Sequence, residues 1–273
     1  MQKFSVVMSA YNGDSPEKFI CAVDSLLNQT SVPSEIIITI DGPIDKSLKE
    51  AVKKYGHNDI IKTIWLEQNV GLANARNIAI KNATCELVAV MDSDDISAPD
   101  RFKKQLLAFE MSNADVIGGL IEEFSSEIGD LKRIRNVPIG TSEIISFSKW
   151  RNPINHVTLM FKKTSFNAVG GYASTRYSED WDLIIRMLSK NMLVENISEV
   201  LVFVRGGDDM VDRRRQIPQV IAELKLFREM NRIGYISLLQ LITNATIRIV
   251  IRIFPRRVTS LIYSRILRKF KTK

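Results

Sequence analysis

Short apolar runs alternate with longer amphipathic segments through the first 120 residues of this 273-residue chain. The apolar runs occupy residues 4–8, 35–40, 60–66, 86–91 and 115–120. Between them, apolar side chains recur at helical spacing, as at Phe19, Val23 and Leu26. Nearly continuous apolar strands that alternate with helices are typical of a parallel sheet covered on both faces. The pattern therefore predicts an α/β fold with a mainly parallel central sheet flanked by helices.

The pattern is looser after residue 120. Further strands are expected within residues 121–134, at 156–161 and at 193–204. A helix is predicted to begin near Ser178, because Glu179, Asp180 and Asp182 then lie in its first turn. A second helix is predicted to run to about Asn231, with Pro218 in its first turn.

A boundary near Gly234 divides the chain into a main domain, residues 1–233, and a C-terminal tail, residues 234–273. Residues 230–273 contain ten Lys and Arg and no acidic residue. The other 28 basic and 31 acidic side chains give residues 1–229 a net charge of −3, although the whole chain carries +7. We therefore expect no nucleic-acid partner for the main domain.

Cys21 and Cys85 lie in apolar segments, so we expect buried, reduced thiols and a reducing compartment. With two histidines in the chain, a structural Cys/His zinc site is nearly excluded. The first residues favour a strand over a secretory signal. The longest charge-free stretch of the tail has 15 residues, fewer than the roughly 20 that a spanning helix needs. A cytoplasmic protein is predicted.

An apolar strand ends abruptly in three carboxylates, those of Asp92, Asp94 and Asp95. Ligands of open α/β sheets bind beyond the carboxyl ends of the strands. Carboxylates gathered there repel one another unless a cation neutralises them. Mg²⁺ or Mn²⁺, sharing its coordination with substrate phosphates, is the natural partner. The alternative is a polar turn that caps the helix after Pro99.

Seven short segments occur in an informative order. They are residues 4–12 (FSVVMSAYN), 25–30 (SLLNQT), 38–42 (ITIDG), 69–77 (NVGLANARN), 91–95 (MDSDD), 170–172 (GGY) and 178–183 (SEDWDL). In this order and spacing, residues 3–205 resemble the family 2 glycosyltransferases. The resemblance implies a GT-A fold and a nucleotide-sugar donor, for which a UDP-sugar is expected. It makes residues 1–233 the catalytic domain.

The resemblance also implies donor-binding roles. Ser9, Ala10 and Tyr11 line the nucleotide pocket, and Asp41 contacts the base. From the residues alone, Asp41 before Gly42 is equally a turn residue.

Further implied roles concern the diphosphate. Arg76 lies near it, Asp92 reaches the ribose or the metal, and Asp94 coordinates the metal. A bound Mn²⁺ or Mg²⁺ supplies the positive charge that a diphosphate leaving group needs. Without the resemblance, Arg76 could equally lie on a solvated helix face.

Glu179 and Asp180 form a second acidic pair. Family members usually invert the anomeric centre, which makes Asp180 the general base and leaves Glu179 to orient the acceptor. A helix start lowers the pKa of a carboxylate, so burial or acidic neighbours must counter it in a base. Helix-terminal charge complementarity alone is the alternative.

Three further features stay open. His156 binds a donor or acceptor phosphate, or is a buried structural histidine. Arg205 and the run at residues 213–215 close over the diphosphate, or the run is a solvated helix face. The usual Asp-Asp pair of the family is reduced to Ile40-Asp41, and the Gln-x-x-Arg-Trp motif of processive synthases is missing, which favours transfer of a single sugar.

The tail predicts a cellular setting. A polar stripe recurs every four residues, at Gln240, Asn244, Arg248, Arg252 and Arg256, and apolar residues occupy the other side. A second helix is expected from Pro255. Basic amphipathic helices bind anionic membranes, which places the enzyme peripherally at the inner face of the plasma membrane. The alternative is a helical hairpin packed on the enzyme or on a second subunit.

Membrane attachment suits an acceptor saccharide on a lipid carrier, and similar family members often build bacterial surface polysaccharide or lipopolysaccharide. Two other functions remain. A haloacid-dehalogenase-like phosphatase also uses Asp-x-Asp after a strand, but Asp95 and Ile96 follow here where that chemistry wants Thr or Val. A non-catalytic nucleotide-sugar-binding module is the other alternative, against which both intact acidic sets argue.

Overall fold

The computed structural model describes residues 2–174, 178–206 and 217–253, with side chains described as far as residue 250. Two compact units form, Met1–Gly207 and Asp208–Lys273. By contacts, the boundary therefore lies earlier than the one expected from sequence near Gly234. The helix that the sequence assigned to the end of the main domain groups with the tail.

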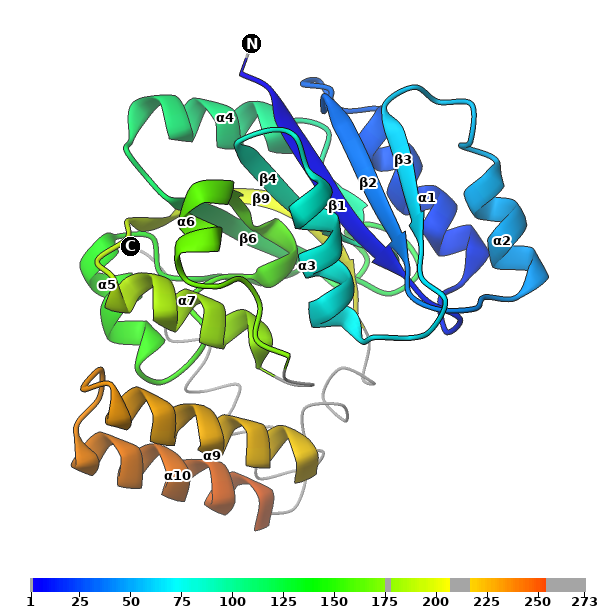
Figure 1. Cartoon of the computed structure of the whole chain (residues 1–273). Coiled ribbons are helices and arrows are strands. Elements are labelled where there is room, and N and C mark those ends of the chain that lie inside the picture. The colour runs from blue at the N-terminus through cyan, green and yellow to red at the C-terminus, as the bar shows by residue number, and fades with distance from the viewer. Residues whose placement is uncertain (1, 175–177, 207–216, 254–273) are drawn as a thin grey trace. The chain divides into compact units, whose positions relative to one another are not determined.

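The first half of the sheet is parallel, as expected (Figure 1). It contains β1 (Phe4–Ala10), β2 (Glu35–Ile40), β3 (Ile61–Trp65) and β4 (Leu87–Asp92) in the order β3-β2-β1-β4. The three strands β1, β2 and β4 are apolar and buried almost throughout, which suits a sheet covered on both faces. In the register, Ser9 of β1 lies beside both Thr39 and Asp92. The carboxyl ends of the three strands thus meet at one edge.

The second half of the sheet is mixed. It contains β5 (Ile96–Ser97), β6 (Val116–Phe124), β7 (Arg133–Arg135), β8 (Met160–Lys162) and β9 (Val194–Arg205). The order continues β4-β8-β6-β9-β5, and β7 pairs with β6. The pairs β4–β8, β6–β8, β6–β7 and β5–β9 are antiparallel, whereas β6–β9 is parallel. The expected α/β class is confirmed, with a sheet that is mainly parallel only in its first half.

The strand expected to begin at His156 begins later. His156–Thr158 form a 3-10 turn, η1, and β8 follows it. The backbone amide of Thr158 donates to the Asn155 carbonyl at 2.9 Å, and the Thr158 hydroxyl donates to the same carbonyl at 2.6 Å. This local bonding satisfies the backbone without a neighbouring strand.

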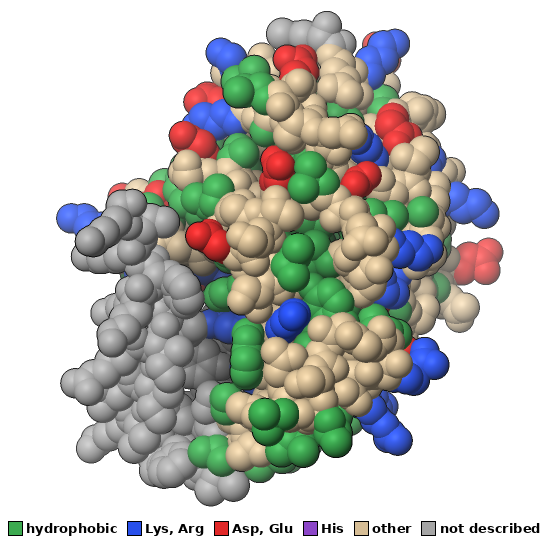
Figure 2. Space-filling model, turned by 90° about the vertical axis from the view of Figure 1, so that its left-hand side faces the viewer, with side chains coloured by type: hydrophobic (Ala, Val, Ile, Leu, Met, Phe, Trp, Pro, Cys, Tyr) green, Lys and Arg blue, Asp and Glu red, His purple; other side chains and the backbone are tan. Residues whose placement is uncertain are grey.

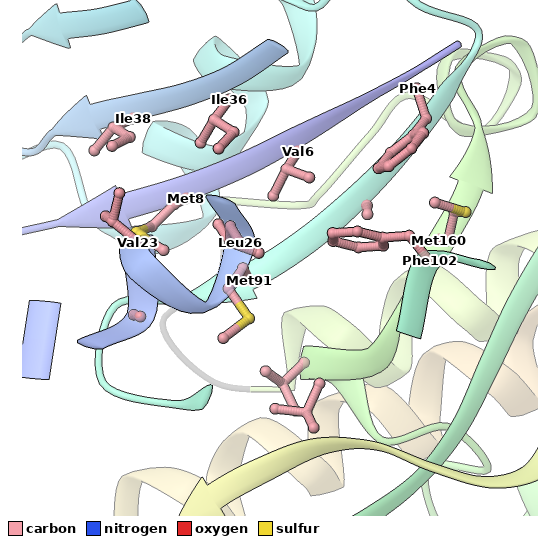
Figure 3. Close-up of a cluster of buried hydrophobic side chains, with 14 of the residues drawn as sticks. Phe4, Val6, Met8, Val23, Leu26, Ile36, Ile38, Met91, Phe102 and Met160 are labelled. Carbon is pink, nitrogen blue, oxygen red and sulfur yellow. The ribbon is translucent and has the colours of Figure 1, made fainter. Parts of the chain in front are cut away.

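Helices cover both faces of the sheet. They are α1 (Pro16–Leu27), α2 (Lys46–Lys53), α3 (Leu72–Asn82), α4 (Arg101–Met111), α5 (Thr141–Ser148), α6 (Lys163–Ala168) and α7 (Glu179–Ser189). Side chains of α1, α2 and α4 enter one core with Phe4, Val6 and Met8 of β1 (Figure 3). Helix α3 packs on β1 and β2 from the opposite face (Figure 1).

One expectation about the cysteines is wrong. Cys21 is exposed and Cys85 is half-buried, and both are free thiols. Helix α1 buries Phe19, Ala22 and Val23, and Cys21 lies on the other side of that face. An apolar segment buries only one face of a helix.

The second unit contains α9 (Ile217–Arg232) and α10 (Leu238–Ile253), which lie side by side. Two residues of the polar stripe of α10, Asn244 and Arg248, are shielded from solvent. Asn244 is 4% exposed, and Arg248 forms an ion pair with Glu223 of α9 at 3.0 Å. The helix expected from Pro255, with Arg256, lies outside the described residues, and nothing is described of the Arg252 side chain. None of the helices that the structure describes is long and apolar enough to cross a membrane.

Figure 2 shows acidic side chains mainly in the upper part of the face in view, mixed there with basic ones, whereas basic and apolar side chains predominate in the lower part.

The core supports a stability prediction. Phe102 of α4 is fully buried, and its ring packs on that of Phe4 at 4.8 Å between centroids. F102A should destabilise the protein by about 3–5 kcal/mol, because truncation leaves a cavity. L107A on the same helix, where the side chain is 54% exposed, should cost less than about 1 kcal/mol. Chemical denaturation followed by circular dichroism measures both, and similar losses would contradict the assigned core.

Candidate active site

A pocket of about 710 Å³ opens at the carboxyl ends of β1 and β2 and at the start of α3. Its lining comprises Ser9, Tyr11, Asp41, residues 69–74, Ser174 and Glu179. Four residues expected to bind or process substrate from sequence, Ser9, Tyr11, Asp41 and Glu179, therefore meet at one cavity. Its place beyond the strand ends is where open α/β sheets bind ligands.

The end of β1 contributes to the lining of the pocket. Ser9 and Ala10 are buried, and the Ser9 hydroxyl has no hydrogen-bond partner among the residues described here. Tyr11, by contrast, is 52% exposed. A buried hydroxyl without a partner at the edge of a cavity is ready to bond a ligand.

Asp14 is a site residue that sequence reasoning missed. Its Oδ2 accepts hydrogen bonds from the Ser93 hydroxyl at 2.8 Å and from the Tyr11 amide at 3.1 Å. It thereby joins the loop after β1 to the acidic loop after β4. Burial raises the pKa of Asp14, and the charges of Asp94 and Asp92 raise it further. The closeness of Asp14 to Tyr11 in the sequence could have indicated a role in the site. Its hydrogen-bond partner Ser93, however, lies 79 residues away.

Asp41 organises the loop that leads into α3. Its side chain is 5% exposed and accepts from the amides of Val70 at 2.7 Å and Gly71 at 3.1 Å. Gly42 has φ +88°, and a Cβ there would lie 2.6 Å from the Asn69 nitrogen. Asp41 thus has the structural role of a turn residue and also lines the pocket.

Arg76 of α3 is buried, 3% exposed, and does not lie on a solvated helix face. Its guanidinium forms an ion pair with Asp92. Burial lowers the pKa of Arg76, but attraction to Asp92, Tyr172 and Glu179 outweighs this and holds the pKa above its usual value. Arg76 therefore stays charged, and its Nε lacks a hydrogen-bond partner within the described part of the chain.

The acidic loop after β4 concentrates negative charge. Asp95 is 4% exposed, and its Oδ1 accepts the backbone amide of Arg205 at 2.9 Å. Burial raises the pKa of Asp95 well above its ordinary range, and the charges of Asp92 and Asp94 add to this. The side chains of Asp92 and Asp94 remain half-buried at the surface of the loop.

Arg205 lies behind this loop. Its guanidinium packs 4.8 Å from the ring centroid of Phe124, and Arg205 is not among the pocket-lining residues. The run at residues 213–215 lies outside the described residues.

Helix α7 brings the second acidic pair. Ser178 precedes it with φ +63°, a left-handed conformation that turns the chain into the helix. Burial raises the pKa of Glu179 to about 7, helped by the charge of Asp180 and opposed by Arg76. Asp180 bonds elsewhere, since its Oδ2 accepts from the Asn152 amide at 2.8 Å and its Oδ1 from the Trp181 backbone at 2.8 Å.

The two acidic clusters converge on Arg76. Asp92 pairs with it directly, and the pKa of Arg76 responds to Glu179. The pKa of Glu179 in turn responds to Asp92 as well as Arg76. The charge of Arg76 thus acts on carboxylates that are far apart in the sequence, those of Asp92 and Glu179.

His156 is half-buried in the turn η1, beside Tyr172. Burial lowers its pKa well below the usual 6.5, and the charge of Arg76 lowers it further. Its Nε2 lies 3.4 Å from the Tyr172 hydroxyl, and the two rings meet edge to face at 5.5 Å. A neutral imidazole at physiological pH offers an anion no net charge.

Comparison with known proteins agrees with this geometry. Residues 5–182 match the family model described as Glycosyl transferase family 2. The chain is 35% identical over 270 residues to an Escherichia coli UDP-Gal:alpha-D-GlcNAc-diphosphoundecaprenol beta-1,3-galactosyltransferase, covering 98% of each protein. It is 32% identical over 264 residues to an amylovoran biosynthesis glycosyltransferase of Erwinia amylovora, covering 96% of this chain and 98% of the relative.

Among solved structures, S. aureus TarS 1–349 in complex with UDP-GlcNAc matches with a TM-score of 0.65 at 21% identity. The match covers 85% of this chain and 66% of that chain.

The half-parallel sheet, with its pocket at the strand ends, defines a GT-A type of enzyme. The expected fold class is thereby confirmed. The chain belongs to glycosyltransferase family 2, and the expectation of a glycosyltransferase is confirmed.

The raised pKa of Glu179 predicts a pH effect on stability. The folded protein holds this proton up to about pH 7, whereas an unfolded chain releases it near 4.5. Between these values the folded state binds more protons, so rising pH costs stability. Since E179Q cannot ionise, its melting temperature minus that of the wild type should increase from about pH 5 to about pH 8.

The exposed Glu143 in the first turn of α5 supplies the control. The difference between E143Q and wild type should stay flat in the same melting series. A flat difference for E179Q as well would refute the buried environment assigned to Glu179.

Proposed function

We propose that this protein transfers a single sugar from a UDP-sugar to a lipid-linked saccharide, with inversion, in bacterial polysaccharide or lipopolysaccharide biosynthesis. The observation that carries the proposal is the pocket at the strand ends, which Ser9, Asp41 and Glu179 line together. The buried Arg76 pairs with Asp92, and its charge acts on Glu179 of this pocket. A positively charged side chain held beside the pocket can offset the charge of a donor diphosphate. The sugar of that donor would then lie toward a carboxylate. The polysaccharide setting and the lipid carrier rest on the names of the two bacterial relatives.

The donor roles follow the contacts. Ser9 offers its unpartnered hydroxyl and Ala10 its backbone, while Tyr11 presents an exposed ring on which a base can stack. Asp41 has carboxylate lone pairs beyond the two that Val70 and Gly71 use, so it can also accept from a nucleobase N–H. Arg76 attracts the diphosphate.

Asp94 and Asp92 fit a divalent cation. Burial is the main cause of the raised pKa of Asp95 and Asp14, and the charges of Asp92 and Asp94 add to it. A cation bound there would relieve this added repulsion. Within the described residues, no three His, Cys, Asp or Glu side chains are grouped to hold a metal by themselves. Mg²⁺ and Mn²⁺ commonly take one or two carboxylates together with substrate phosphates. Bound there, the ion supplies Lewis-acid neutralisation of the leaving diphosphate.

We assign the general base to Asp180, with Glu179 orienting the acceptor. Glu179 is the second candidate for the base, because it lines the pocket and its pKa is near 7. Asn152 orients Asp180 through its amide. In this proposal His156 and Arg205 have a supporting, structural role and do not bind phosphate.

The second unit would attach the enzyme to an anionic membrane surface. On α10, Leu238, Leu239 and Ile242 are 63%, 73% and 55% exposed. Arg248 is engaged by Glu223, so the apolar face would enter the lipid while the remaining basic residues attract its charge. In this orientation the apolar face of α10, and not its polar stripe, contacts the membrane.

A transfer assay tests the function. With Mn²⁺, a panel of UDP-sugars and a GlcNAc-diphospholipid acceptor, the wild type should release UDP and lengthen the acceptor with one of the sugars. D94N should lose about 10²-fold or more, because charge on the diphosphate is no longer offset. Comparison of D180N with E179Q identifies the general base, because the variant that lacks the base should lose about 10²–10⁴-fold in kcat.

Mass spectrometry of the acceptor counts the sugars added, and NMR of the product reads the anomeric configuration. UDP release without acceptor elongation across the panel, or a product that retains the donor configuration, would reject the proposal as stated.

Vesicle flotation tests the membrane contact. The full chain should bind vesicles rich in phosphatidylglycerol and leave neutral vesicles free. L239E should weaken binding about tenfold, because it places a charge in the apolar face. M111E on α4, where the side chain is 80% exposed, is the matched control and should bind normally. Equal binding of L239E and wild type would contradict the assigned face.

A further inference from the structure

An irregular turn, residues 169–172, lies between α6 and α7 and carries two consecutive left-handed glycines. Gly170 has φ +81° and Gly171 has φ +72°. A Cβ on Gly171 would lie 2.9 Å from the Asn77 Oδ1 and 3.0 Å from the Phe166 ring. This turn therefore requires glycine both for its conformation and for its close approach to α3.

Side chains of two helices satisfy the backbone of the turn. From α3, the Asn77 amide donates to the Tyr172 carbonyl at 2.8 Å, and its Oδ1 accepts the Tyr172 amide at 3.0 Å. From α7, Arg186 donates to the carbonyls of Val169 and Gly171, the latter at 2.7 Å. Arg186 is itself held by Asp182 at 2.8 Å.

The turn thereby connects the two halves of the site. Helix α3 carries Arg76 immediately before Asn77, and α7 carries Glu179 and Asp180 in its first turn. The Tyr172 ring contacts His156, and the charges of Arg76 and Glu179 both act on its hydroxyl. A displacement of the turn would change the distance from the diphosphate side to the acidic side.

We infer that Asn77 is a positioning residue for transfer, whose paired hydrogen bonds to Tyr172 fix the acid-bearing helix α7 relative to the donor-binding helix α3. Asn77 touches neither pocket nor carboxylates, so it acts through the turn. The inference rests on the proposed roles of Arg76 and of Glu179 and Asp180.

The positioning role predicts a split between binding and turnover. N77A removes both hydrogen bonds to the turn but leaves Arg76 on its own helix, so UDP affinity should change by less than roughly twofold. The value of kcat should fall about ten- to hundredfold, because misplacement of a reacting group by about 1 Å costs that much.

The experiment uses the full chain with UDP and Mn²⁺ in calorimetry, and the UDP-sugar and acceptor found for the wild type in kinetics. N82A is the matched control, because Asn82 is an exposed asparagine of α3 whose amide bonds only within the helix, to Ile78 at 2.9 Å. G171A perturbs the same contact from the side of the turn, because its Cβ would press on the Asn77 Oδ1, while the sequence of α3 stays unchanged. Melting temperatures report folding.

Loss of kcat in N77A and G171A, with UDP affinity preserved and N82A normal, supports the inference. Wild-type kcat in N77A overturns it, and so does a parallel fall of kcat, UDP affinity and melting temperature, which indicates a structural role only. A wild type that transfers no sugar overturns the proposed function and this inference with it. Wild-type transfer with a fully active N77A overturns the inference alone.

Discussion

Three carboxylates gather at the end of β4, and the buried guanidinium of Arg76 pairs with the first of them, that of Asp92. A buried guanidinium is strongly disfavoured unless it is paired, so its contact with Asp92 constrains both side chains. The pair ties α3 to the end of β4, and the field of Arg76 reaches Glu179 on α7. The orientation of Arg76 and Asp92 therefore depends on this ion pair.

The sheet fixes where Asp92 of this pair emerges. Because β1 lies between β2 and β4, its register aligns Ser9 with Asp92 on one side and Thr39 on the other. A shift by one residue would move buried apolar side chains of all three strands to the wrong face. The apolar sequence of the strands thus fixes where the polar residues that follow them emerge.

Much of this arrangement can be predicted from local pattern. Apolar runs locate β1, β2 and β4, and acidic residues locate the start of α7. What local pattern cannot supply is the identity of a distant partner. Asp14 and Ser93 form a hydrogen bond although 79 residues separate them. The turn η1 at His156 depends on hydrogen bonds that Thr158 donates. Likewise, the period of α10 reveals two faces, but it does not reveal that Asn244 is buried or that Arg248 pairs with Glu223 of α9.

Adjacent carboxylates on a helix cannot share one environment, and this separates Glu179 from Asp180. Consecutive helical side chains diverge by about 100°, so Glu179 reaches the pocket while Asp180 meets Asn152. The helix start favours ionisation of Glu179. For Glu179 burial outweighs that effect and brings its pKa to about 7, in the range where a carboxylate exchanges protons at physiological pH. Thus the direction of each side chain from the first turn of α7, rather than its chemical type, determines that Glu179 lines the pocket and that Asp180 bonds to Asn152.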